Sequence, residues 1–163
     1  MNRATAMKKI KERLRNFRYI YKEERTQINE IHLTFKMDSN CYELQSSMLF
    51  EENWLDILTF ISPRVVKLDY DELEYIDILK TINFINWVSK SSCGRMYLDD
   101  YEDIAISLRF TYDWVEKYPD IVISEFETTI QYYEDLFTII LDVANGKKDY
   151  YEAKTFITEM WKL

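Results

Sequence analysis

The stretch that decides the fold covers residues 31–61 and reads IHLTFKMDSNCYELQSSMLFEENWLDILTFI. Over 31–37, apolar and polar side chains alternate, as they do in a strand that buries one face. The alternation returns over 42–51, after the turn-forming residues 38–40. A third run, 54–61, is apolar on both faces apart from one acid and one threonine. Three strands with short turns between them predict an antiparallel meander.

The segment before the meander has a helical period and a basic charge. Apolar residues recur at spacings of three and four, which predicts an amphipathic helix over 4–22; the stripe is Met7, Ile10, Leu14, Phe17 and Tyr21. Residues 1–25 hold nine Lys or Arg and three Glu, so their net charge is +6. The basic side chains could touch an acidic partner or lipid headgroups, but the simpler interpretation is that they solvate the helix and neutralise an acidic body.

A helix start follows the meander. Asp69 is a candidate N-cap, Glu72 stands at the third helical position, and Leu68 can pack on Leu73 as a hydrophobic staple. Acidic residues crowd this first turn, where the helix dipole favours them. We predict a helix from here to about Ser89.

Another hairpin comes next. Residues 95–98 and the alternating run 104–112 predict two antiparallel strands around the acidic turn 99–103.

Two helices are predicted to end the chain. Ser124 and Glu127 form a candidate capping box for a helix that stops at Asn145-Gly146, a C-cap signature. Asp149 and Glu152 predict the start of a last helix.

The predicted order is therefore α-βββ-α-ββ-α-α. Strands grouped in hairpins, rather than alternating with helices, indicate an α+β fold in which helices pack on an antiparallel sheet. We find no linker and no repeat, so residues 1–163 are predicted to be a single domain with its core at about 5–146. Residues 147–163 are then an additional C-terminal helix.

Composition excludes several functions. With two glycines, one histidine and two cysteines, the chain cannot form a Gly-rich nucleotide loop and has little material for metal or nucleophile chemistry. The net charge is −8, and residues 26–163 carry twelve basic against twenty-six acidic residues, which is −14. An acidic body repels phosphate backbones, so we expect no nucleic-acid partner.

No stretch approaches the roughly 18 apolar residues of a membrane-spanning helix, so we expect no membrane insertion. The N-terminus also lacks the apolar core of a signal peptide. We therefore expect a cytoplasmic protein whose Cys41 and Cys93 are free thiols.

With this order established, the chain resembles the YbjN family, whose fold is like that of type III secretion chaperones. The resemblance is carried by a helix ending in an Asn-rich apolar segment (82–87), a Gly-Arg-aromatic strand with an acidic turn (94–99), the alternating strand 104–110, and the Tyr-Tyr-x-x-Leu-Phe helix core at 132–137. It covers roughly residues 5–146.

The resemblance implies a small bacterial cytosolic protein that forms a homodimer and is not an enzyme. Secretion chaperones bind unfolded stretches of a client, but a similar fold does not transfer that activity. The chain departs from the family in its low Gly and Pro content in turns and in the helix after Gly146.

The helix predicted to start at Asp69 carries two apolar faces. At about 100° per residue, one face holds Tyr75, Ile78, Leu79, Ile82 and Ile85. The other holds Leu73, Ile76, Phe84 and Trp87. A helix lying on a sheet needs only one apolar face. We predict that the first face packs on the sheet and that the second meets another subunit or a partner. The alternative is that the first or last helix covers the second face within the monomer.

Other candidate residues are weaker. His32 has no placed Asp, Ser or Cys beside it in the sequence and is expected to be an exposed strand residue. The acids of turn 99–103 lack the spacing and the glycine of a calcium loop. Cys93 has only Lys90 and Arg95 nearby to lower its thiol pKa. We therefore predict no catalytic residue, no metal site and no cofactor.

The expected function is non-enzymatic protein binding by a homodimer. The sheet or a groove along the first helix would hold a partner segment, by strand addition or helix docking. The alternative is a small regulatory or sensory domain with a small molecule in an apolar pocket. An enzyme ranks third, and carboxylates clustered with His32 or Cys93 in a cleft would favour it.

Overall fold

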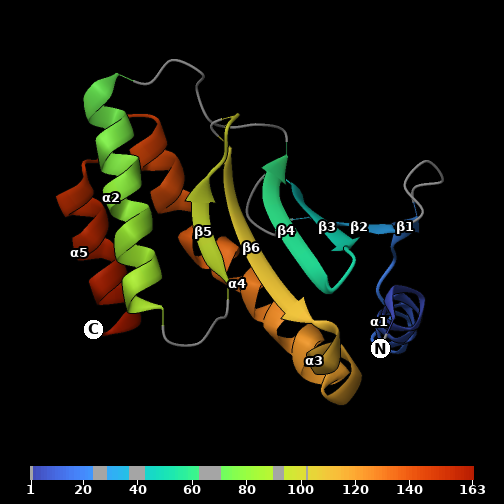
Figure 1. Cartoon of the computed structure of the whole chain (residues 1–163). Coiled ribbons are helices and arrows are strands. Elements are labelled where there is room, and N and C mark those ends of the chain that lie inside the picture. The colour runs from blue at the N-terminus through green and yellow to red at the C-terminus, as the bar shows by residue number, and fades with distance from the viewer. Residues whose placement is uncertain (1, 24–28, 37–42, 63–70, 90–93, 102) are drawn as a thin grey trace.

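The fold was analysed in a computed structural model, which describes residues 2–23, 29–36, 43–62, 71–89, 94–101 and 103–163. It is α+β, as predicted, and its elements follow in chain order (Figure 1). They are α1 (Arg3–Asn16), β1 (Lys22–Glu23), β2 (Glu30–Lys36), β3 (Glu43–Phe50), β4 (Trp54–Ser62), α2 (Glu72–Val88), β5 (Arg95–Leu98), β6 (Ile104–Thr111), α3 (Tyr112–Lys117), α4 (Pro119–Ala144) and α5 (Tyr150–Trp161).

The strands form one antiparallel sheet in the order β1-β2-β3-β4-β6-β5. The meander β2-β3-β4 and the hairpin β5-β6 are both confirmed. The chain leaves β4 through α2, forms β5, and returns with β6 beside β4, so β5 becomes an edge strand. At the other edge lies the two-residue strand β1, which the sequence did not predict.

One face of the sheet is the core. Along β3 and β4, residues at every second position are buried, from Leu44 to Phe50 and from Leu55 to Thr59. Two of these residues are polar, and they satisfy each other because Ser46 Oγ and Thr59 Oγ1 lie 2.8 Å apart in a hydrogen bond. Helix α4 lies behind the sheet (Figure 1) and packs on β6.

Helix α1 packs on the body through the fully buried Ala6, Ile10 and Leu14, and two of its basic side chains add polar contacts. The Lys9 Nζ donates a 3.0 Å hydrogen bond to the Glu116 carbonyl, and the Arg13 Nε lies 3.1 Å from an Asp120 carboxylate oxygen. The helix was predicted to reach residue 22 but ends at Asn16. Arg18 adopts a left-handed φ of 63°, which no helix continues, and the chain turns toward β1.

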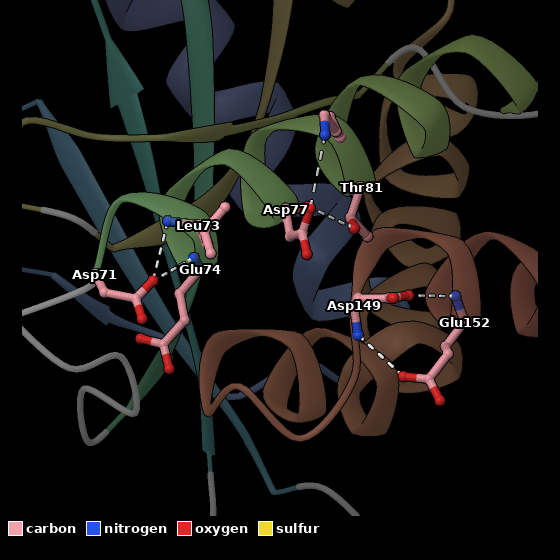
Figure 2. A network of polar contacts seen from close by, with 8 residues as sticks. Asp71, Leu73, Glu74, Asp77, Thr81, Asp149 and Glu152 are labelled. Carbon is pink, nitrogen blue, oxygen red and sulfur yellow. Dashed lines mark hydrogen bonds and ion pairs between the residues drawn. The ribbon is translucent and has the colours of Figure 1, made fainter.

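Helix α2 begins later than predicted. Its N-cap is Asp71, not Asp69: the Asp71 Oδ1 accepts hydrogen bonds from the Leu73 N–H at 2.9 Å and the Glu74 N–H at 2.8 Å (Figure 2). Asp69 and the predicted staple residue Leu68 lie outside the described residues. Leu73, the other half of that staple, is exposed.

The predicted start of α4 at Ser124 is wrong. The helix begins at Pro119, whose fixed φ suits a first turn, and Ser124 lies inside it. The β-branched run 121–123 weakens helix propensity, but Val122 and Ile123 are fully buried, and this burial outweighs it. The strand predicted to include Tyr112 ends one residue earlier, and the short α3 follows it.

The last helix starts as predicted. Asp149 and Glu152 form a reciprocal capping box, with hydrogen bonds of 2.9 and 3.0 Å (Figure 2). Gly146 takes a left-handed φ of 64° at the end of α4, so the C-cap prediction is also confirmed. The hydrophobic core runs from Ala6 to Ile157, so α5 belongs to the core instead of being an addition to it.

Candidate functional site

Helix α2 carries apolar side chains around most of its circumference. Its inner side packs against α4, α5 and β5, and buries Ile78, Thr81, Ile82, Phe84 and Ile85. Its other side is exposed, and we call the apolar residues there the α2 outer face: Leu73, Tyr75, Ile76, Leu79 and Trp87. Leu73 and Trp87 are 73% and 78% exposed. Both predicted faces therefore exist, but their membership differs from the prediction.

Two corrections follow from the position of α5. Phe84 was predicted on the free face but is only 6% exposed, because α5 covers it and places the Lys154 ammonium 5.4 Å from its ring centre. Tyr75 and Leu79 were predicted to pack on the sheet, yet they belong to the α2 outer face. The helix lies beside β5, not flat across the sheet (Figure 1), so its buried arc is rotated relative to the prediction.

The Asn86 side chain of α2 is hydrogen-bonded to the outer edge of β5. Its Nδ2 donates to the Met96 carbonyl and its Oδ1 accepts from the Met96 N–H, each at 2.9 Å. An edge strand exposes backbone groups that can pair with another chain, and this side chain occupies both groups of one residue. The sequence analysis did not identify this role; an amide inside the apolar run 82–87 was the available signal.

An open cavity of about 620 Å³ lies against one side of α1, and we call it the α1 groove; every described residue that lines it belongs to α1. Its lining residues are Ala4, Met7, Lys8, Lys11, Glu12 and Arg15. Three cations against one acid give this lining a positive charge. The Arg15 Nε donates a 3.1 Å hydrogen bond to the Tyr21 hydroxyl, and Lys9 and Arg13 on the same helix bind the body of the protein. The basic helix thus has an anchoring side and a groove side. The sequence indicated charge neutralisation as the simpler interpretation, with an acidic partner or lipid headgroups as the alternative, and it also indicated a groove along this helix as one site for a partner segment.

A second cavity lies where the C-terminal end of α2 meets α4 and the end of α5, and we call it the C-terminal pocket. It has a volume of about 350 Å³. Its lining residues are Val88, Ser89, Thr128, Gln131, Tyr132, Asp135, Trp161 and Leu163. No residue of the α2 outer face belongs to it.

His32 forms a polar cluster with residues that strand pairing brings together. Ser47 stands opposite His32 in the β2-β3 register, and their Oγ and Nδ1 atoms are 3.0 Å apart. The His32 Nε2 lies 3.4 Å from a Glu30 carboxylate oxygen. A serine, a histidine and a carboxylate in a row can in principle activate a nucleophile. Neither the α1 groove nor the C-terminal pocket includes any of the three, so no cavity described above would hold a substrate against them.

The other candidate residues, which are the metal ligands and the acidic turn at 99–103, form no functional site in the part of the chain that the structure describes. Within the described residues, no three His, Cys, Asp or Glu side chains stand close enough to hold a metal ion. The Asp99 carboxylate accepts hydrogen bonds from the Tyr101 and Asp103 N–H groups, each at 2.8 Å, and so shapes its own turn. Cys41, Cys93 and Glu102 lie outside the described residues. Across the part of the chain that the structure describes, no helix is both long and apolar enough to cross a membrane.

Comparisons with known proteins identify no relative of this chain. No protein-family description matches the chain, and neither the curated proteins nor the solved structures contain a significant match. The resemblance to the YbjN family therefore stays a prediction.

Proposed function

We propose that this chain is a non-enzymatic protein-binding module, organised like the YbjN and secretion-chaperone-like proteins, whose first partner is a second copy of itself. The observation that carries the proposal is the α2 outer face. A helix that already buries one side in its own core needs no further apolar residues for folding. Five large apolar side chains on the opposite side form the kind of exposed patch that marks an interaction surface.

The spacing within this face suits an antiparallel pair of α2 helices. From Leu73 to Trp87 the face is about 21 Å long at 1.5 Å per residue. In a two-fold pair, the same patch serves both copies. With the axis near Thr81, Ile76 of each copy meets Trp87 of the other, and the two helix dipoles run in opposite directions. This arrangement buries the most exposed aromatic residue of α2 at two equivalent places.

Strand addition is the less favoured way to recruit a further partner. At β5 the backbone of Met96 is already bonded to Asn86, and at the opposite edge β1 is only two residues long. The α1 groove offers the better alternative. Its positive lining with Met7 between the cations fits an acidic, amphipathic segment, which would dock by charge and by apolar contact.

The dimer is tested by measuring the absolute mass in solution by light scattering over a concentration series. The wild-type protein should have a mass near twice 19.9 kDa. Trp87→Glu should give the monomer mass, because a charge would be buried at both ends of the pair. Ile20→Glu is the matched control: Ile20 is 91% exposed and lies outside α2, so this variant should keep the dimer.

Several outcomes would contradict the proposal. A wild-type mass near 19.9 kDa at every concentration excludes self-association. A Trp87→Glu variant that keeps the dimer mass places the interface elsewhere. Circular dichroism of each variant establishes that it is folded before its mass is interpreted.

The α1 groove is tested separately, with a designed amphipathic peptide that carries glutamates on its polar face. Fluorescence anisotropy should show binding that weakens with salt and with the charge reversal Lys8→Glu. Lys147→Glu, at the distant α4–α5 turn, should leave binding unchanged. Equal loss in both variants would mean that only the overall charge matters. Binding to anionic lipid vesicles but not to the peptide would point to headgroups and contradict the peptide assignment.

A further inference from the structure

The C-terminal pocket is built by three helices and lies apart from the α2 outer face and the α1 groove. Val88 and Ser89 come from the end of α2, Thr128 to Asp135 from the middle of α4, and Trp161 and Leu163 from the end of the chain. Figure 1 shows the C-terminus beside the end of α2 that leads to β5. Its volume of about 350 Å³ lies in the range of sites for small organic molecules.

One wall of the pocket is aromatic and fixed. The Tyr132 and Trp161 rings are stacked, with their centres 5.1 Å apart and an angle of 25° between their planes. The Tyr132 hydroxyl donates to the Ile85 carbonyl at 3.3 Å, which ties the ring to α2. Burial raises the pKa of the Tyr132 phenol against the opposing effect of the Arg95 charge, so this phenol is neutral at neutral pH. A wall held from two helices is present before any ligand arrives, which lowers the ordering cost of binding.

The polar side chains of the pocket come mostly from one side of α4. Thr128, Gln131 and Asp135 follow each other at helical spacings of three and four. The Thr128 hydroxyl is already used, since it donates to the Ser124 carbonyl at 2.9 Å. Asp135 is the charged side chain of the lining. None of the residues that the structure describes forms a hydrogen bond or an ion pair with it.

We propose that the C-terminal pocket binds a small aromatic amine. The flat ring would lie against the Tyr132–Trp161 wall with Val88 and Leu163 at its edges. The ammonium group would reach the Asp135 carboxylate, with the Gln131 amide oxygen as a second acceptor. This inference is independent of the proposed dimer, because it uses neither the α2 outer face nor a second copy.

The experiment is a titration of the full chain with tryptamine, an indole that carries an ethylammonium arm, followed by backbone amide NMR shifts. Saturable shifts are expected at residues 128–135 and 158–163. Asp135→Asn should weaken binding about fivefold, since an exposed ion pair contributes modestly. Glu134→Gln removes the neighbouring acid of α4, which is exposed and outside the pocket, and should leave the affinity unchanged. Indole-3-propionate, with a carboxylate in place of the amine, should bind at least fivefold more weakly.

Each contrary result overturns the inference. Shifts that do not saturate, or that spread over the acidic surface, would mean non-specific attraction. Equal weakening by Glu134→Gln and Asp135→Asn would mean the same. Equal affinity for the carboxylate ligand would exclude recognition of an amine. The salt dependence of wild-type binding gives a second measurement that does not rely on any variant: the tryptamine affinity should fall as salt rises, and an unchanged affinity would contradict a contact to Asp135.

Discussion

Replacing Asn86 with alanine should destabilise the fold far more than its partly exposed position on α2 suggests. The side chain makes two hydrogen bonds of 2.9 Å to the backbone of Met96, whose side chain is buried. The substitution leaves one N–H and one C=O without this partner at the edge of β5. Each buried polar group that loses its partner costs about 1–3 kcal/mol, and some water can reach a sheet edge. We therefore expect a loss of about 2–4 kcal/mol in the free energy of unfolding.

The assay is equilibrium unfolding in urea, with Asn83→Ala as the matched control. Asn83 is exposed on the same helix, so its replacement brings the same gain in helix propensity, a few tenths of a kcal/mol, without touching β5. The difference between the two variants isolates the edge contact. Asn86→Asp is a second test, because a carboxylate can accept from the Met96 N–H but cannot donate to its carbonyl. Equal stability of the two alanine variants, or a fully stable Asn86→Asp, would refute the reasoning.

Three further changes have expected outcomes. Gly146→Ala should lower the unfolding free energy by about 1–2 kcal/mol in thermal denaturation, because φ is 64° and a Cβ would meet the Glu74 side chain. Adding Glu74→Ala to the same chain should restore only part of the lost stability. Full recovery would show that backbone strain is not involved. Asp149→Ala should cost about 1 kcal/mol in urea unfolding through loss of the α5 capping box, and an unchanged midpoint would contradict that role. Burial raises the pKa of the Tyr133 phenol well above about 10, and its hydroxyl donates to the Ile104 carbonyl at 2.8 Å. Because the fold holds the neutral form, this stabilisation is complete below pH ~10 and is lost as the pH rises further. The tyrosinate absorbance of Tyr133, taken as the difference between the wild-type chain and Tyr133→Phe, should therefore appear together with the loss of circular dichroism, and its appearance in a folded chain would contradict this.

The parts of the fold that sequence could predict are those set by local chemistry. The period-two alternation along β2 and β3 determines which of their side chains face the core, and a slip of one residue would turn every one of them outward. The capping box at Asp149 and the left-handed Gly146 depend on backbone groups within a few residues. Such signals need no tertiary partner, and these appear in the structure as predicted. The capping box predicted at Ser124 is a signal of the same kind but marks no helix start, because α4 already begins at Pro119.

The parts that could not be predicted depend on distant contacts. The run 121–123 has low helix propensity and becomes helical because the interior takes up Val122 and Ile123. Helix α1 ends at Asn16 although its apolar period continues to Tyr21, because the chain must turn to pair β1 with β2. In both cases the local pattern was real, but a longer-range requirement outweighed it.

The candidate site also has parts that the sequence could predict and parts that it could not. The apolar content of α2 indicated two faces, and this holds in the structure. Which residue belongs to which face depends on where α5 lies, and the 100° rule contains no information about that. Phe84 was therefore assigned to the wrong side. The C-terminal pocket was not predictable at all, since Tyr132 and Trp161 meet only after α4 and α5 have packed together.

Helix α5 thus determines which side chains of α2 are exposed. It gives Ala153 and Ile157 to the core and covers Phe84, which leaves the α2 outer face exposed. Without α5, the exposed arc of α2 would also include Phe84. In the proposed pair of α2 helices, α5 therefore limits the contact to the α2 outer face.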